Sequence, residues 1–320
     1  MYVAIAGGNG FVGRHLTREL VGAGHRVTWL SHRPGRAESL GFAADDVREV
    51  VFDYHEPDGA WVEEVASANA VVNLSGYPIS SRWNATTVHL IRESRIDTTR
   101  ALVGAIAGAA KEGTGPQVYV GASGSGYYGD CGDEVLHEDS PPGEDQLAHL
   151  AVEWEAEALA ACEHDVRVVV MRTGVVMGEE GFLPKILLPM RLFVGGPVGS
   201  GRQYFPWVHV ADAAGAYAYA IETPGLSGPV NLCSPEQVTM HAFMRALGHV
   251  LHRPSWLPVP TFALRIVLGK VAPYMVFSQR LGSAKLSASG YEWRFGSLEQ
   301  ALADAVRHSK RSAREYSLSS

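Results

Sequence analysis

Three glycines near the start of the chain have the spacing of a turn that binds phosphate. Gly7, Gly10 and Gly13 follow a short apolar run and open a segment of helical spacing that begins at Phe11 and Val12. In such a turn one glycine allows the tight bend, the second lets the backbone approach a pyrophosphate, and the third lets helix and strand pack closely. Free N–H groups at the helix start then bind the anion. The pattern predicts a dinucleotide site that includes all five residues.

The end of the second predicted strand indicates which dinucleotide binds. Sites for NAD carry an acidic residue about 20 residues beyond the glycine turn, where it binds the ribose hydroxyls. Here Ser31, His32 and Arg33 follow the strand, and the first acidic residue is Glu38. A hydroxyl, an imidazole and a guanidinium can bind a 2′-phosphate, which a carboxylate would repel. The sequence therefore predicts NADP(H) rather than NAD(H), with a solvated surface charge as the alternative for Arg33.

Three further segments follow predicted strands and should lie at the same edge of the sheet, where ligands bind in such folds. Asp53 follows the third strand and could accept a hydrogen bond from the adenine amino group, or simply form a turn. Leu74, Ser75 and Gly76 follow the fourth strand, and Thr173 to Val176 follow the sixth. We expect all three segments to contact the cofactor.

One arginine stands on the apolar face of a predicted helix. Ile91, Arg95, Thr98, Leu102 and Ile106 share that face by helical spacing. An arginine on a face that packs on the sheet needs an anionic partner or a water-filled cleft. The dinucleotide or an acidic substrate could supply the anion, and an internal salt bridge is the alternative.

Alternating elements must position these residues. Apolar, β-branched strands that alternate with helices predict an α/β fold, a doubly wound parallel sheet of the Rossmann type. The predicted strands are 2–6, 26–30, 50–52, 70–74, 118–120, 166–171 and 229–232, and the predicted helices lie near 60–67, 86–110, 146–162 and 212–221. The alternation stops after Arg172, which suggests a second, smaller domain on the substrate side. We expect a Rossmann domain of residues 1–173 and 207–232, a smaller domain of 174–206 and 233–310, and a frayed tail of 311–320.

Composition excludes several classes of protein. The 320 residues are 46% hydrophobic and 19% charged, which is typical of a globular chain. A net charge of −7 argues against nucleic acid as a partner. Three widely spaced cysteines indicate a reducing compartment, and neither a signal peptide nor an uncharged apolar span is evident. We expect a cytoplasmic protein with a small-molecule substrate, no metal and no membrane contact, and we leave a homodimer open.

Longer stretches of the sequence carry a resemblance to a known family. They include GGNGFVGRHL at 7–16, VVNLSGYPI at 71–79, IRESRI at 91–96, RTGVVMG at 172–178, GGPVGSGRQYFPWVHVAD at 195–212 and LPVPTFALRIVLGK at 257–270. Over nearly its whole length the chain resembles the atypical extended short-chain dehydrogenases/reductases. More narrowly, it resembles the nucleoside-diphosphate-sugar epimerase-like group called epimerase family proteins, which carry a C-terminal domain of unknown function. The resemblance implies NADP(H) binding and a substrate pocket between the two domains. The cofactor contacts that it implies are Ser31, His32, Leu74, Ser75, Arg95 and the backbone at Val176.

The usual catalytic pair of that superfamily is missing. Short-chain dehydrogenases use a Tyr-x-x-x-Lys pair on the helix after the fifth strand, where the lysine lowers the pKa of the tyrosine from about 10. The corresponding positions here are Leu147 and Ala151, and no such pair occurs anywhere in the sequence. Ordinary tyrosine–lysine acid–base catalysis is therefore excluded.

Three other residues could handle a proton. Ser123 ends the fifth strand, near the place where the superfamily has a substrate-binding hydroxyl. Tyr127 could donate a proton, although no cation is evident beside it, and loop packing is the alternative. His209 could carry a proton, and a structural hydrogen bond at the domain junction is the alternative. Asp212 is expected to cap the helix that follows.

Two functions fit these observations. The first is an NADP(H)-dependent oxidoreductase or epimerase that acts on a carbonyl or hydroxyl group of a small molecule without the tyrosine–lysine pair. The alternative is a non-catalytic NADP(H)-binding sensor or scaffold, which would keep the glycine turn and need no proton donor.

Overall fold

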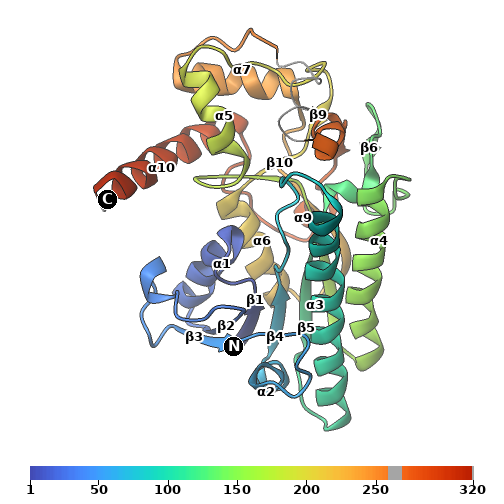
Figure 1. The fold of residues 1–320 in the computed structure, drawn as a ribbon. Coiled ribbons are helices and arrows are strands. Elements are labelled where there is room, and N and C mark those ends of the chain that lie inside the picture. Colours follow the sequence, from blue (N-terminus) through green and yellow to red (C-terminus); the bar gives the residue numbers. More distant parts are fainter. Residues whose placement is uncertain (259–268, 319–320) are drawn as a thin grey trace.

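A seven-stranded parallel sheet forms the centre of the molecule (Figure 1). The computed structural model describes residues 1–258 and 269–318, so part of the LPVPTFALRIVLGK stretch lies outside the described residues. The strand order is β11-β7-β5-β4-β1-β2-β3, and every neighbouring pair is parallel. The strands are β1 (Tyr2–Ala6), β2 (Arg26–Ser31), β3 (Val47–Val51), β4 (Ala70–Asn73), β5 (Val118–Gly124), β7 (Arg167–Thr173) and β11 (Gly228–Leu232).

Helices cover both faces of the sheet (Figure 1). On one face lie α1 (Phe11–Gly22) and α6 (Val210–Glu222); on the other lie α2 (Ala60–Ser67), α3 (Ala85–Lys111) and α4 (Gln146–Leu159). Because helices cover both faces, the strands β1, β4, β5 and β7 are buried at nearly every residue and do not alternate, whereas Arg48 and Val51 of the edge strand β3 are exposed. The predicted doubly wound α/β fold is confirmed.

Most of the remaining elements form a smaller group beyond the carboxyl ends of the strands (Figure 1). Its helices are α5 (Phe182–Arg191), α7 (Met240–Leu251) and α10 (Leu298–Leu318), whereas the short α9 (Ala284–Ala288) packs beside β11 with Leu286 in the core of the sheet. Short strands pair β8 (Val175–Met177) with β10 (Trp207–His209), β9 (Tyr204–Phe205) with β12 (Val238–Thr239), and β6 (Val135–Leu136) with β13 (Arg280–Leu281). Within the part of the chain that forms the sheet lie the short helices η1 (Glu38–Leu40), η2 (Ser125–Tyr128) and η3 (Ala160–His164), and a longer η4 spans Gly269–Val276.

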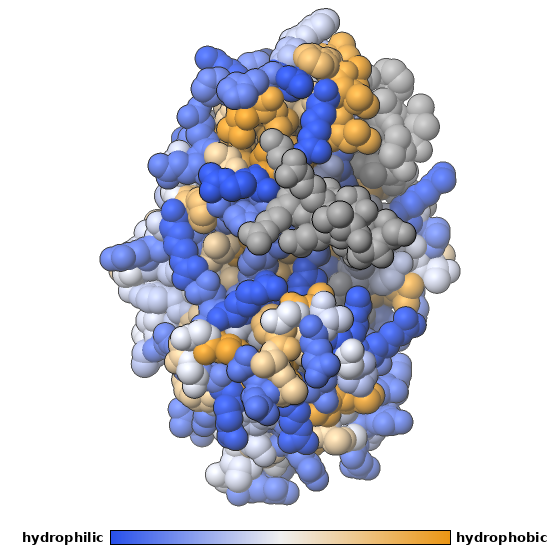
Figure 2. Space-filling model, turned by 90° about the vertical axis from the view of Figure 1, so that its left-hand side faces the viewer, coloured by the Kyte–Doolittle hydropathy of each residue, from blue (hydrophilic) through white to orange (hydrophobic). Residues whose placement is uncertain are grey.

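Helix α5 has one buried and one exposed apolar side. Leu183 and Leu187 pack in the core that α5 shares with α7 and α10, whereas Leu188, and Leu192 just after the helix, are about 60% exposed. Figure 2 shows hydrophobic side chains gathered in the upper part of this face of the molecule, where α5 and α7 lie. Among the helices of residues 1–258 and 269–318, none is both long and apolar enough to cross a membrane.

Two local predictions differ from the structure. The tail predicted from Arg311 is helical as far as Leu318, because α10 continues through it. Asp212 does not cap α6: the cap is His209, whose ring nitrogen Nδ1 accepts a hydrogen bond from the backbone N–H of Ala211 at 3.2 Å. Asp212 instead lies in the first turn of the helix, fully buried.

Candidate functional site

Close backbone contacts leave no room for a side chain at two positions of the glycine turn. Gly7 has a φ of +80°, and a Cβ there would lie 2.9 Å from the carbonyl of Leu74. A Cβ on Gly13 would lie 2.4 Å from the carbonyl oxygen of Gly7. Gly10 is the N-cap of α1 and has no side chain to satisfy the N–H groups of the first turn. These uncapped N–H groups, beside the exposed Gly10, fit a dinucleotide pyrophosphate.

A fourth glycine of the turn, Gly8, was not singled out in the sequence, and it packs against the indole of Trp29. A Cβ on Gly8 would lie 2.1 Å from the indole of Trp29. That indole is fully buried and donates a hydrogen bond from Nε1 to Thr17 Oγ1 at 2.8 Å. Thr17 in turn donates to the carbonyl oxygen of Gly13 at 2.8 Å. The turn is therefore fixed to β2 and α1 by a tryptophan and a threonine.

The residues predicted to bind a 2′-phosphate lie next to this turn. Asn9 donates from Nδ2 to Ser31 Oγ at 3.1 Å, which joins the turn to the end of β2. The His32 ring stacks on Phe52, with ring centroids 6.2 Å apart. Arg33 is exposed and forms no ion pair with any described residue. Its charge is therefore available to a phosphate.

The structure also places the other predicted cofactor segments. Asp53 Oδ1 accepts a hydrogen bond from the N–H of His55 at 2.9 Å, which matches the turn-forming alternative. The N–H of Leu74 donates to the carbonyl oxygen of Ala6 at 2.8 Å, so residues 74–76 begin at the carboxyl end of β4, beside the end of β1. The N–H of Ser75 donates to the side chain of Asn73 at 3.0 Å.

The segment after the sixth predicted strand lies over the start of α1. Val176 belongs to β8, and a Cβ on nearby Gly178 would lie 2.6 Å from the ring of Phe11. Two ion pairs join the same elements, Arg14 with Glu180, and His15 with Glu179 at 2.8 Å. The structure thus brings the segments of Phe11, Val12 and Val176 together, as the topology predicted. The ion pairs were not predicted.

Arg95 is a buried cation without an internal carboxylate partner among the described residues. Its Nη1 donates to the carbonyl oxygens of Tyr77 and Ile91, each at 3.0 Å, and its guanidinium lies 5.1 Å from the Trp154 ring. Burial lowers the pKa of Arg95 to about 10. A Cβ on Gly76 would lie 3.0 Å from Nη2 of Arg95, so the charge stands at the carboxyl end of β4. The salt-bridge alternative is not found there, and the charge remains for an external anion.

Ser123 belongs to a buried ionic network that the sequence did not reveal. Its hydroxyl donates to Glu155 Oε1 at 2.6 Å. Arg172 holds the same carboxylate with two hydrogen bonds, Nε to Oε1 at 2.9 Å and Nη2 to Oε2 at 2.8 Å. All three side chains are at most 6% exposed. A signal existed, because Glu155 shares the buried side of α4 with Ala151 and Ala158, as Arg95 does in its own helix.

Arg172 places a cation beside Tyr127 and Tyr128, where the sequence showed none. Its guanidinium carbon lies 3.4 Å from the centroid of the Tyr127 ring, on the ring face rather than at the hydroxyl. Tyr128 accepts from Arg172 Nη1 at 2.9 Å and donates to Asn231 Oδ1 at 2.6 Å. Burial raises the pKa of Tyr128 to about 12. Tyr128 is therefore part of the network, while the Tyr127 hydroxyl has no hydrogen bond to any described residue.

His209 has the geometry of the structural alternative. Besides capping α6, it places Nε2 3.3 Å from Asp304 Oδ2 of α10, and its ring centroid lies 3.9 Å from that of Phe295. Burial lowers the pKa of His209 to about 4, so the ring is neutral near pH 7. Asp212 accepts from the backbone N–H groups of Arg294 at 2.7 Å and Phe295 at 2.9 Å. Both residues therefore tie α6 to the C-terminal segment.

An apolar cluster occupies the place of the missing catalytic pair. Leu147 and Leu150 of α4 pack in a cluster with Trp83, Tyr274 and the fully buried Val271. Ala151 is buried in α4. Leu147 and Ala151 themselves offer no proton donor at the positions where the superfamily has one.

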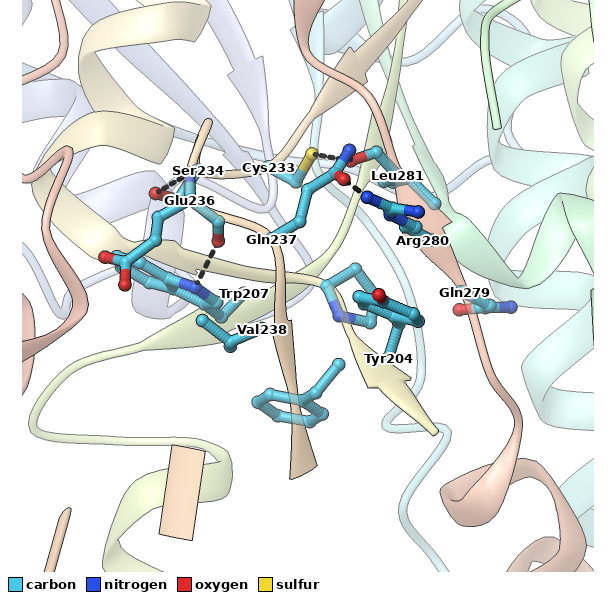
Figure 3. A pocket seen from close by; sticks show the side chains of 12 residues that line it. Tyr204, Trp207, Cys233, Ser234, Glu236, Gln237, Val238, Gln279, Arg280 and Leu281 are labelled. Atoms are coloured by element: carbon cyan, nitrogen blue, oxygen red, sulfur yellow. Dashed lines mark hydrogen bonds between the residues drawn. The ribbon is translucent and has the colours of Figure 1, made fainter. Parts of the chain in front are cut away.

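A small cavity lies where the two parts of the chain meet (Figure 3). Trp207, which donates to the carbonyl oxygen of Glu236 at 3.0 Å, lies on one side of it, and Arg280, which donates to Gln237 at 2.7 Å, lies on another. Its volume is about 10 Å³, which is at the lower limit for one water molecule. This cavity is too small to be the expected substrate pocket. Across the described ranges, no group of three or more His, Cys, Asp or Glu side chains is placed to hold a metal ion.

Comparison with known proteins agrees with the geometry. Residues 3–233 match the NAD dependent epimerase/dehydratase family, and residues 259–305 match a domain of unknown function, DUF1731. The chloroplastic SDR39U1 homolog of Arabidopsis thaliana, an epimerase family protein, is 37% identical over 94% of this chain and 86% of its own length. The epimerase family protein YfhF of Bacillus subtilis is 36% identical over 97% of this chain and 99% of its own. The crystal structure of human epimerase family protein SDR39U1 (isoform 2) with NADPH matches with a TM-score of 0.82 and 32% identity, over 96% of this chain and 99% of that chain. These matches confirm the resemblance found in the sequence.

Proposed function

The chain belongs to the NAD-dependent epimerase/dehydratase family, and we propose that it binds NADP(H) and acts as an oxidoreductase or epimerase on a small molecule. The observation that carries the proposal is the glycine turn at the uncapped start of α1, beside Ser31, His32 and Arg33. No acidic side chain occurs among residues 31–37. The similarity to human SDR39U1, which was crystallised with NADPH, supports the same cofactor here.

Each group of residues would hold a different part of the dinucleotide. The N–H groups at the start of α1 bind the pyrophosphate, Ser31, His32 and Arg33 bind the 2′-phosphate, and Arg95 offers a cation at the end of β4. When bound, the nicotinamide ring would supply hydride exchange with a carbonyl or carbinol carbon of the substrate. Val176 and residues 74–76 would enclose the cofactor at the sheet edge.

Among the residues predicted to handle a proton, Tyr127 and Ser123 keep a role in this proposal. Tyr127 has a hydroxyl that no described residue engages, so it is the proposed proton donor. The ionised carboxylate of Glu155 can only accept, so Ser123 donates to it and keeps its lone pairs for a substrate hydroxyl. For His209 we propose the helix-capping role, because Nδ1 accepts from the N–H of Ala211 and Nε2 faces Asp304.

A non-catalytic NADP(H)-binding sensor is the second candidate. The observation that favours it is the apolar cluster of Leu147, Leu150 and Trp83 at the place of the usual catalytic pair. The experiment that separates the two follows NADPH oxidation by the purified chain against panels of carbonyl compounds, quinones and sugar nucleotides. Turnover of one member supports the enzyme, whereas tight NADPH binding without turnover of any member supports the sensor.

Replacement of Arg33 tests the cofactor assignment. In Arg33→Glu, a carboxylate would face the 2′-phosphate, so NADPH affinity should fall by at least about tenfold, since hydrogen bonds to charged groups are worth about 1.5–3 kcal/mol. NADH affinity should change by less than about threefold, because NADH lacks the phosphate. Isothermal titration of both dinucleotides measures the difference. Arg26→Glu, which reverses a charge at the opposite end of β2, is the control. Equal losses for both dinucleotides would contradict the assignment.

A further inference from the structure

We propose that Glu49 is a positioning residue that gives the site its preference for a 2′-phosphate, by holding residues 32–37 in the shape that binds it. The inference rests on the proposed NADP(H) binding. It concerns a residue on β3, next to β2 in the sheet, where Glu49 pairs in register with Trp29.

The Glu49 carboxylate binds three successive backbone N–H groups of the loop after β2. Its Oε2 accepts from Gly35 at 2.7 Å, from Arg36 at 2.8 Å and from Ala37 at 3.2 Å. Its Oε1 accepts from Arg36 as well, at 3.1 Å. Successive N–H groups that converge in this way form an anion-binding concavity. Here the anion is a side chain of the neighbouring strand, which fixes the loop to the sheet.

The other end of the loop is fixed to the dinucleotide turn. The N–H of Arg33 donates to Ser31 Oγ at 3.4 Å, and Asn9 of the glycine turn donates to the same oxygen at 3.1 Å. Gly35 has a φ of +89°, which favours glycine, and Ala37 is buried. The loop is thus held at its start by the phosphate-binding turn and at its end by Glu49.

A fixed loop presents two cations at the place where a 2′-phosphate would lie. Arg33 and Arg36 lie on either side of the Pro34-Gly35 pair, both are exposed, and neither forms an ion pair with a residue in the described ranges. Holding a binding loop in shape before the ligand arrives removes the cost of ordering it on binding. Because the three N–H groups occupy the Glu49 carboxylate, Glu49 is not placed like the acidic residue of an NAD site, which accepts from ribose hydroxyls.

The test compares Glu49→Gln with Glu38→Gln. Glutamine keeps the size of Glu49 but replaces one acceptor oxygen with a donor, so the loop loses its anchor. Glu38 is an exposed acid of the same loop region, and Glu38→Gln removes the same charge without touching the anchor. Binding of NADPH, NADH, 2′,5′-ADP and 5′-AMP is measured by calorimetry on the full chain.

We expect Glu49→Gln to weaken NADPH and 2′,5′-ADP by about tenfold and to leave NADH and 5′-AMP within about twofold, where tenfold corresponds to about 1.4 kcal/mol. Glu38→Gln should leave the NADPH-to-NADH ratio unchanged. If Glu49→Gln does not fold, Gly35→Ala provides the same test, because an added Cβ there meets no neighbour and strains only the φ of the loop. It should shift the ratio in the same direction.

Two results would overturn the inference while the proposed function stands. One is an unchanged NADPH-to-NADH ratio in Glu49→Gln and Gly35→Ala. The other is a gain of NADPH affinity in Glu49→Gln, which would mean that the carboxylate repels the phosphate rather than organising its site. A wild-type chain that binds neither NADPH nor 2′,5′-ADP would overturn the proposed function, and the inference with it.

Discussion

His209 holds a neutral imidazole at the start of α6, in a cluster of titratable groups from several elements. His15 of α1, Glu179 of the segment before α5, and Asp304 and His308 of α10 all lie near enough to affect its pKa. Burial has the largest effect and lowers the pKa of His209 from 6.5 to about 4. Between about pH 4 and pH 6.5, His209 is protonated in the unfolded chain and neutral in the folded chain. The contribution of His209 to the free energy of unfolding is therefore complete above about pH 6.5 and is lost as the pH falls toward about 4.

Asparagine at this position should weaken that pH dependence. Asn is a good helix N-cap and does not titrate, so His209→Asn keeps the cap and removes the buried proton site. The loss of unfolding free energy between pH 7.5 and pH 4.5 should shrink by up to about 3 kcal/mol, at about 1.4 kcal/mol per unit of pKa shift. Urea titrations at the two pH values measure it. His249→Asn, at an exposed histidine, is the control. The same acid sensitivity in both variants would exclude His209 as its source.

Single residues were predictable where a charge stood on an apolar stripe. Arg95 was identified in that way, and the structure shows it buried without a carboxylate in the described parts of the chain. The pairing of Glu155 with Arg172 was not predictable, because sequence spacing does not show that a helix and a strand bring two charges together. Asp212 is a favourable capping residue by type. Its position depends on N–H groups of Arg294 and Phe295, about 80 residues away in the chain.

The buried Arg172–Glu155 pair joins elements rather than single residues. Through Ser123 it connects α4 with β5 and β7, and through Tyr128 and Asn231 it reaches η2 and β11. The carboxyl ends of three neighbouring strands are therefore held by one network. The same network sets the position of the loop that carries Tyr127.

Removal of one charge from this network should be costly. Glu155→Gln leaves Arg172 charged and unpaired in the core, which costs about 3–5 kcal/mol. Glu153→Gln, on the exposed side of the same helix, breaks only the surface pair with Arg92 and should cost at most about 1 kcal/mol. Urea unfolding measures both. Replacing both partners, as in Glu155→Met with Arg172→Met, should recover much of the loss. Equal effects of the two glutamine variants would contradict a structural role for the pair.

Long elements were predictable from sequence and short ones were not. All seven predicted strands, from residues 2–6 to 229–232, correspond to strands of the sheet. They were recognisable because buried parallel strands are rich in apolar and β-branched residues. Strands such as β9, β12 and β13 have two residues each, too few to show a period. Their pairing depends on tertiary contacts, so the arrangement of the C-terminal part was left undefined.

At the scale of the molecule, the C-terminal segment belongs to the core of the sheet. Leu286 and Tyr291 pack in the same cluster as Val3 and Ile5 of β1. The Tyr291 hydroxyl donates to the carbonyl oxygen of Asp212 at 2.9 Å. Arg294 forms a two-point ion pair with Glu19 of α1, at 2.6 and 2.7 Å. The second predicted domain therefore shares part of its core with the sheet.

A shared core predicts a single unfolding transition. Leu302 is fully buried where α10 meets α5 and α7, so Leu302→Ala should cost about 2–5 kcal/mol. It should shift the transition seen by tryptophan fluorescence and by far-ultraviolet circular dichroism by the same amount. Leu188→Ala, at an exposed position of α5, should change stability by at most about 0.5 kcal/mol. Two separate transitions, of which Leu302→Ala moves only one, would show that the parts unfold independently.

The contact between Gly8 and the Trp29 indole also limits how this chain can diverge. Any side chain at position 8 would overlap the indole, so position 8 can change only after position 29 has become smaller. A smaller residue at 29 would in turn leave Thr17 without its hydrogen-bond donor. The three positions should therefore covary in descendants of this sequence, and a relative with a side chain at position 8 should also lack the tryptophan.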